Sequence, residues 1–227
     1  MKKLTILAIF AASLAASSQL AAQAPAPKGA SELEQAKAKL REGKPAEALA
    51  LVDPIVARAE AKEAKDPEAM CPSAAAAFLV AYMRQSSKLN ISVSVENDWC
   101  DAMLVQGYAL GEQKRFSEAA DRLGKLVKHD KFNANYLAEY AFALRSSGQV
   151  DLAMEFYRKT KDAASHYSDK AAQRHWRAVA LRGIGFIEFD RANWKAAEKA
   201  YKDSLKDEPG NQIALGELEL IKQKTSN

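Results

Sequence analysis

The chain has 227 residues and is nearly balanced in charge, with 33 Lys and Arg against 29 Asp and Glu. Acidic and basic residues are interspersed along the sequence, which is typical of solvated helix faces. A protein that binds nucleic acid through its phosphates needs a clustered basic surface. The composition therefore gives no reason to expect a nucleic-acid ligand.

The amino-terminal residues have the layout of a secretory signal peptide. Lys2 and Lys3 precede an apolar run at residues 4–16, and small residues follow at 17–24. A membrane-spanning helix needs about 20 residues, so this run is short for an anchor, although an uncleaved anchor is the alternative interpretation. We expect cleavage after Ala22, which removes residues 1–22 and leaves a net charge of about +2. The expected destination is the periplasm of a Gram-negative bacterium, without stable membrane insertion after cleavage.

Residues 23–30 (QAPAPKGA) contain two prolines and no apolar periodicity, as expected for an exposed, flexible tether. About 200 residues follow, which is enough for one domain with its own core. The sequence therefore predicts a single exported domain behind a tether.

Cys71 and Cys100 are the two cysteines of the chain. In an oxidising compartment such a pair favours a disulfide, and the alternative is two buried thiols too far apart to meet. A zinc site needs more ligands at motif spacing than these two cysteines and the three histidines supply. We expect no metal and no cofactor.

The rest of the chain has a helical pattern, because apolar and small residues recur at intervals of three and four. Ser31 and Glu34 have the spacing of a capping box for the first helix. Residues 90–98 (NISVSVEND) are the one non-helical stretch of note, either a short strand or a packed loop. The pattern predicts helices at 31–42, 45–64, 68–87, 98–112, 116–129, 134–146, 150–165, 169–190, 193–206 and 211–223.

These helices form pairs, and equivalent residues recur in the pairs with steps of 34 and 44 residues. A matched pair that returns three times in phase predicts a solenoid. The small residues Gly107, Ala141 and Gly185 recur in the first helices with the same steps. The second helices carry equivalent residues at Phe116, Ala119, Leu123 and Leu126, at Val150, Ala153, Tyr157 and Thr160, and at Trp194, Ala197, Tyr201 and Ser204.

This pattern resembles the tetratricopeptide repeat (TPR) family, whose 34-residue unit has a small residue where its helices cross, an aromatic residue that opens the second helix, an alanine and a closing proline. The matching residues are Leu181, Gly185, Trp194, Ala197, Tyr201 and Pro209 in unit 178–211, Ala141, Gly148, Ala153 and Tyr157 in unit 134–177, and Gly107, Phe116 and Ala119 in unit 100–133. The resemblance implies an all-α, right-handed superhelical solenoid of antiparallel helix pairs, with about four to five units and a capping helix.

Other parts of the chain match the unit less well. Residues 31–99 are expected to form degenerate repeats, with Ala48 in the first of them and residues 70–85 in a second. Ala48 precedes Ala119 by 71 residues, which is room for two units. The ten extra residues of unit 134–177 are expected to lengthen its second helix through Ser165. Residues 212–227 are expected to form the capping helix and tail.

The resemblance implies that the first helix of each pair lines a concave face that binds a peptide or a helix of a partner protein. Tyr108, Phe142 and Phe186 occupy equivalent places there and form an aromatic row. The alternative is that these aromatic residues are buried against the neighbouring unit. The lysine–asparagine clamp with which some relatives hold acidic tails is missing, so that function is not implied. The expected binding residues are Tyr108, Phe142, Arg145, Arg182, Phe186 and Phe189.

No residues of this sequence form a nucleophile motif, a phosphate-binding loop or a helix-borne metal pair. His166 and His175 lie near Asp162 and Asp169 and are interpreted as solvated helix residues. We therefore expect a non-enzymatic binding module. The alternative is a structural subunit of an envelope assembly, which would dock through its convex face or through residues 72–81. A homo-oligomer is possible, and stable self-association without a ligand would favour this alternative.

Overall fold

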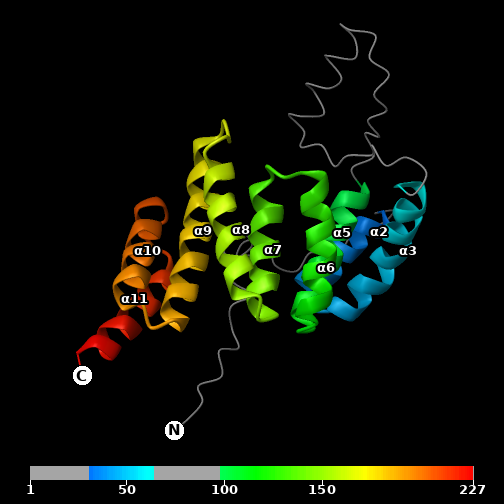
Figure 1. Cartoon of the computed structure of the whole chain (residues 1–227). Helices are drawn as coiled ribbons and strands as arrows, with labels where there is room; N and C mark the ends of the chain where they lie inside the picture. Colours follow the sequence, from blue (N-terminus) through cyan, green and yellow to red (C-terminus); the bar gives the residue numbers. More distant parts are fainter. Residues whose placement is uncertain (1–30, 64–97, 227) are drawn as a thin grey trace, which may run out of the picture.

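The computed structural model describes residues 31–63 and 98–226. Within these two ranges the protein is all-α, with nine helices and no strand, arranged side by side in a row (Figure 1). The expected signal peptide, the tether, helix 68–87 and Cys71 lie outside the described residues. The helices are α2 (Glu32–Arg41), α3 (Pro45–Glu63), α5 (Asp98–Glu112), α6 (Phe116–His129), α7 (Ala134–Ser146), α8 (Val150–Ala164), α9 (Lys170–Asp190), α10 (Trp194–Asp207) and α11 (Gln212–Thr225).

The nine helices confirm the predicted ones to within one or two residues at each end. We call α2, α5, α7, α9 and α11 the first helices, and α3, α6, α8 and α10 the second helices. Ser31, Asn133, Asp169 and Asn211 cap first helices by accepting backbone N–H bonds with their side chains. Such caps satisfy amides that have no partner inside the helix.

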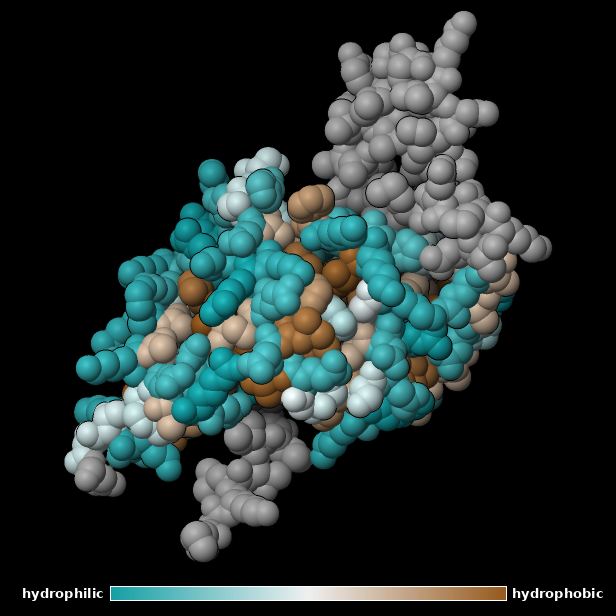
Figure 2. All heavy atoms as spheres, viewed as in Figure 1, coloured by the Kyte–Doolittle hydropathy of each residue, from teal (hydrophilic) through white to brown (hydrophobic). Residues whose placement is uncertain are grey.

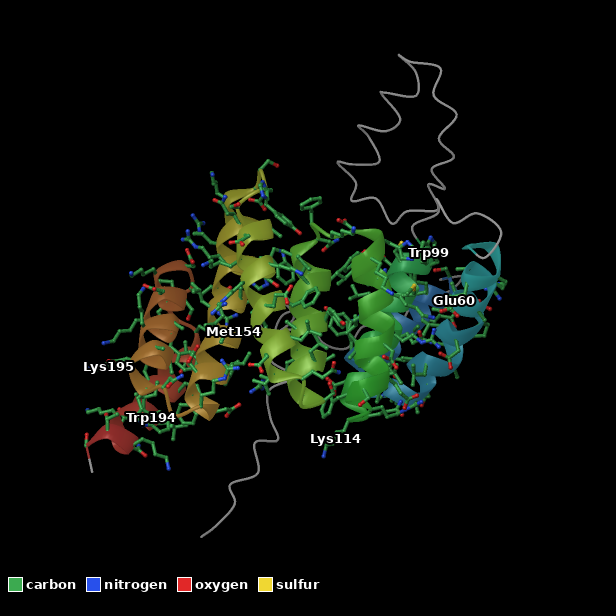
Figure 3. All side chains as sticks on the ribbon, in the orientation of Figure 1. Glu60, Trp99, Lys114, Met154, Trp194 and Lys195 are labelled. Atoms are coloured by element: carbon green, nitrogen blue, oxygen red, sulfur yellow. The ribbon has the colours of Figure 1, made fainter. Side chains whose placement is uncertain are left out.

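The turn from first to second helix has the same geometry in all four pairs. One residue of each turn adopts a positive φ, and the amide after it bonds to the carbonyl five residues earlier at 2.8–2.9 Å, as in a Schellman motif. These residues are separated by 71, 34 and 44 positions, which are the steps of the sequence repeat. They are Gly43, Lys114 (Figure 3), Gly148 and Ala192.

The core confirms the repeat register. Ala48, Ala119, Ala153 and Ala197 lie at equivalent positions of the four second helices and are fully buried. Gly107, Ala141 and Gly185 are buried where the first helices cross them, and Ala36 fills this place in α2. A Cβ on Gly185 would approach the ring of Tyr201 to 2.7 Å, and a Cβ on Gly107 would approach Leu123 to 2.6 Å. The small residues are therefore required by close helix crossing, as predicted.

Consecutive pairs stack mainly by packing each second helix against the first helix that follows it. Helix α2 contacts α5, α5 contacts α7, and α7 contacts α9, while each second helix packs against the next first helix. Because α3 packs directly on α5, the α2–α3 pair is the spatial neighbour of the α5–α6 pair. This differs from the expectation that the 71 residues between Ala48 and Ala119 correspond to two stacked units, since sequence spacing does not reveal where intervening residues pack.

The expected cause of the ten extra residues in unit 134–177 is wrong. Helix α8 has 15 residues, only one more than α6. Helix α9 has 21 residues against 13 in α7, because it begins at Lys170, well before the repeat position of Ala178. Asp169 caps α9 and fixes this early start. The boundary expected at 177/178 therefore falls inside a helix.

The buried apolar residues form one large cluster from α2 to α9 and a smaller one between α10 and α11. Trp194 is partly buried in the smaller cluster, and exposed Pro209 follows the end of α10. None of the described helices is long and apolar enough to cross a membrane. The expected binding residues on the first helices are all partly buried.

Candidate binding face on the first helices

Four equivalent side chains form a row along the first helices. Tyr108 in α5, Phe142 in α7 and Phe186 in α9 are each partly buried. The same step of 34 residues leads from Phe186 to Leu220 in α11, which is 42% exposed. Leu220 was missed by the sequence interpretation, although the repeat step extended into α11 would have found it. We call this row the first-helix face.

Arg145 connects the middle of the row. Its guanidinium carbon lies 5.9 Å from the ring centroid of Phe142 and 5.0 Å from that of Phe186, so that it joins α7 to α9 by cation–π contacts. It also donates to Asp190 Oδ2 at 3.3 Å. The side chain is only 16% exposed, and its buried Nε has no hydrogen-bond partner among the described residues.

Arg182 also forms an ion pair within the chain. Its guanidinium pairs with the carboxylate of Glu208, which follows α10, and His175 Nδ1 lies 2.7 Å from the other oxygen of that carboxylate. Phe189 packs its ring edge to face against Trp194, with centroids 5.1 Å apart. Arg182 and Phe189 therefore hold α9 to the α10 helix and to the turn behind it, which leaves less of each side chain for a partner.

The α5 end of the row contains a buried acid that the sequence did not reveal. The Tyr108 hydroxyl donates to Asn135 Oδ1 at 3.2 Å and also interacts with the carboxyl of Glu139. Glu139 is only 7% exposed, and this burial raises its pKa to about 7 despite the hydrogen bond with Tyr108. Burial also raises the pKa of Tyr108 well above its ordinary value. This polar group joins α5 to α7 beneath the face.

The charges along the first-helix face are paired internally. At the α2 end the place equivalent to Tyr108 is held by Lys37, whose Nζ lies 2.9 Å from Asp101 Oδ2 in α5. With Arg145 paired to Asp190 and Arg182 to Glu208, these three cations of the face all have acidic partners within the chain. Such a surface suits an apolar ligand better than a strongly charged one.

The side of the second helices has a different character. A hollow of about 550 Å³ lies against α6 and α7, lined by Lys125, Lys128, Tyr140 and other residues, and one of about 300 Å³ lies between α3 and α6. Glu60 at the end of α3 (Figure 3) pairs with Arg122 and Lys125 of α6 at 2.7 and 2.8 Å. In the view of Figure 2, apolar residues gather over α7 and α8 between polar margins.

The described residues contain no group of three or more His, Cys, Asp or Glu that could hold a metal ion. No family model matches the chain, and no curated protein matches it either. The described residues therefore form an all-α arrangement of consecutively packed antiparallel helix pairs, with a partly aromatic face on the first helices.

Proposed function

We propose that this protein is a non-enzymatic binding module, a right-handed solenoid of the TPR type that acts in the cell envelope. Its first-helix face receives an apolar peptide or helix of a partner protein. The observation that carries this proposal is the row of Tyr108, Phe142, Phe186 and Leu220 at equivalent, partly exposed positions. A surface whose pattern repeats with the fold fits a ligand that runs along several units.

The chemistry of the row sets the chemistry of the partner. Aromatic rings offer large contact areas to aliphatic and aromatic side chains at low cost in conformational entropy. Because the cations of the face already have acidic partners, an acidic tail would have to displace one of them. We therefore expect an amphipathic helix or extended segment that presents apolar side chains, and not a chain terminus read by its carboxylate.

We assign Arg145 and Arg182 a positioning role in place of direct contact with a partner. Both guanidinium groups pair with acids of the chain and are mostly buried. Arg145 fixes the distance between Phe142 and Phe186, so it sets the spacing of the row.

The proposal also includes export of the protein to the cell envelope. The layout of residues 1–22 supports export, and an oxidising compartment would allow a Cys71–Cys100 disulfide. Cys100 is buried in α5, near the start of the described second segment, and Cys71 lies outside the described residues.

The face is tested with two matched leucines. Leu220 and Leu152 are 42% and 36% exposed on helices, but Leu152 lies on the second helix α8. We expect Leu220→Glu to reduce recovery of the partner from envelope extract at least about tenfold, because a charge would enter an apolar contact, whereas Leu152→Glu should leave recovery unchanged. Quantitative mass spectrometry of proteins bound to the tagged chain measures this. Equal recovery with both variants contradicts the assignment of the face.

The second candidate is a structural subunit that docks through its second helices. The hollows along α3, α6 and α7 favour it, because they are lined in part by charged side chains that another subunit could contact. Under this alternative the Leu152→Glu variant, and not Leu220→Glu, would lose the partner.

A further inference from the structure

The α11 end of the first-helix face contains an acid that is an exception to the internal pairing of charges along this face. Glu217 lies three residues before Leu220, so the two side chains share one side of α11. Glu217 is partly buried, and it forms no hydrogen bond or ion pair with any residue that the structure describes. An ionised carboxylate in this place has lost part of its hydration without gaining a partner, which costs free energy.

The repeat register shows which partner Glu217 lacks. Glu139 in α7 occupies the equivalent place, one step of 44 and one step of 34 residues earlier in the chain. Its carboxyl interacts with the hydroxyl of Tyr108 in the preceding first helix. The residue of α9 that corresponds to Tyr108 is Phe186, which has no hydroxyl group. The same repeat position therefore has an internal partner in α7 and none in α11.

A second polar group without a partner lies beneath this end of the face. Tyr201 of α10 is fully buried, and its ring packs edge to face against Phe186 with centroids 5.7 Å apart. Its hydroxyl has no hydrogen-bond partner among the described residues. Burial raises the pKa of Tyr201 above its ordinary value, and Glu217 is the charged group that adds most to this rise. The unpaired acid and the buried hydroxyl therefore interact with one another and indicate one site for an external polar group.

The charges near Glu217 determine which sign of charge this site would bind. Arg145 pairs with Asp190 at 3.3 Å, so the charge of this guanidinium is already compensated. Burial raises the pKa of Glu217, and Asp190 raises it further, whereas Arg145 lowers it by less. Glu217 therefore leaves one uncompensated negative charge at this end of the face. An ammonium group carries three donors, which is enough for the Glu217 carboxylate and the Tyr201 hydroxyl oxygen.

We propose that the site formed by Glu217 and Tyr201 binds a lysine or arginine side chain of the segment that the first-helix face receives. The proposal rests on the proposed function and deepens it, because this basic residue would lie next to the apolar residue that contacts Leu220. The segment then has a fixed direction on the face. Its basic residue lies at the α11 end, and its other apolar residues follow along Phe186 and Phe142.

Selection from a random peptide library displayed on phage tests the site with the purified protein. We expect the wild-type chain to select peptides in which a lysine or arginine lies at a constant spacing from apolar residues. Glu217→Gln should abolish the enrichment of basic residues, keep that of apolar residues, and weaken binding of a selected basic peptide about tenfold. Glu217→Lys should favour an acidic residue at the same place. Glu219→Gln is the control and should select like wild type, because Glu219 is exposed on the opposite side of α11.

The results separate this site from the face as a whole. Basic residues that are enriched equally by wild type and Glu217→Gln, or peptides selected for apolar residues alone, overturn the basic site and leave the apolar face in place. Selected peptides that bind Leu220→Glu as tightly as wild type contradict the face itself. A library that yields no binding peptide overturns both proposals.

Urea unfolding provides an independent measurement that needs no ligand. Because Glu217 has no partner among the described residues, Glu217→Gln should be at least as stable as wild type, with a midpoint that is equal or higher. A lower midpoint would show that Glu217 is paired within the chain in solution, and this result also overturns the site.

Discussion

We expect Gly183→Ala to lower the free energy of unfolding by about 3 kcal/mol. A Cβ at this position would lie 2.2 Å from Cε1 and 2.3 Å from Cζ of Tyr157. Tyr157 is buried in α8 among the core residues, so its ring cannot swing into solvent to make room. The α8–α9 contact, which joins two successive pairs, must open instead. Urea denaturation measures the loss.

Gly216→Ala is the matched control for this change. Gly216 also lies inside a helix, but a Cβ there would meet no atom within 4 Å. Alanine has the higher helix propensity, so the control should gain up to about 1 kcal/mol. Equal effects of the two substitutions would contradict close crossing of α8 and α9 as the reason for the glycine.

The second large effect concerns pH. We expect Glu139→Gln to stabilise the protein by about 3 kcal/mol at pH 8 and to have little effect near pH 4.5. Burial raises the pKa of Glu139 from an ordinary 4.5 to about 7 in the folded state. The neutral acid is therefore favoured by folding, and ionisation costs stability. This cost grows as the pH rises from about 4.5 to about 7 and is constant above that range, and glutamine removes it.

Thermal or urea unfolding of both proteins from pH 4.5 to 8 measures this difference. Glu155→Gln is the control, since Glu155 is exposed and forms a surface pair with Lys159 at 2.6 Å. Such a surface pair contributes about 0.5 kcal/mol or less, so its loss should change stability little. Stability curves that run parallel for wild type and Glu139→Gln would show that Glu139 does not have a raised pKa.

Much of the fold could be predicted because small residues recur at the positions where helices cross. Gly107, Ala141 and Gly185 are needed where helices cross closely, and the alanines of the second helices are fully buried. The helix ends follow from capping and turn chemistry, which is local. The stacking of α3 directly on α5 and the early start of α9 depend on tertiary packing, and spacing along the chain does not encode either.

The candidate site was predictable only in part. The row of Tyr108, Phe142 and Phe186 follows from the register, and so does Leu220 once α11 is treated as a first helix. The partners of Arg145 and Arg182 were not predictable, because Asp190 and Glu208 belong to other elements or turns. For the same reason the burial of Glu139 against α5 had no sequence signal, since an acid at a helix position usually faces solvent.

The most direct test of the binding face is site-specific photocrosslinking in the native host. A benzophenone side chain would replace Leu220 on the first-helix face in one variant and Leu152 on α8 in another. Both positions are exposed, so incorporation should leave the fold intact. The proposed function predicts a crosslinked partner protein from position 220 and none from position 152. A partner captured from position 152 and not from position 220 would contradict it.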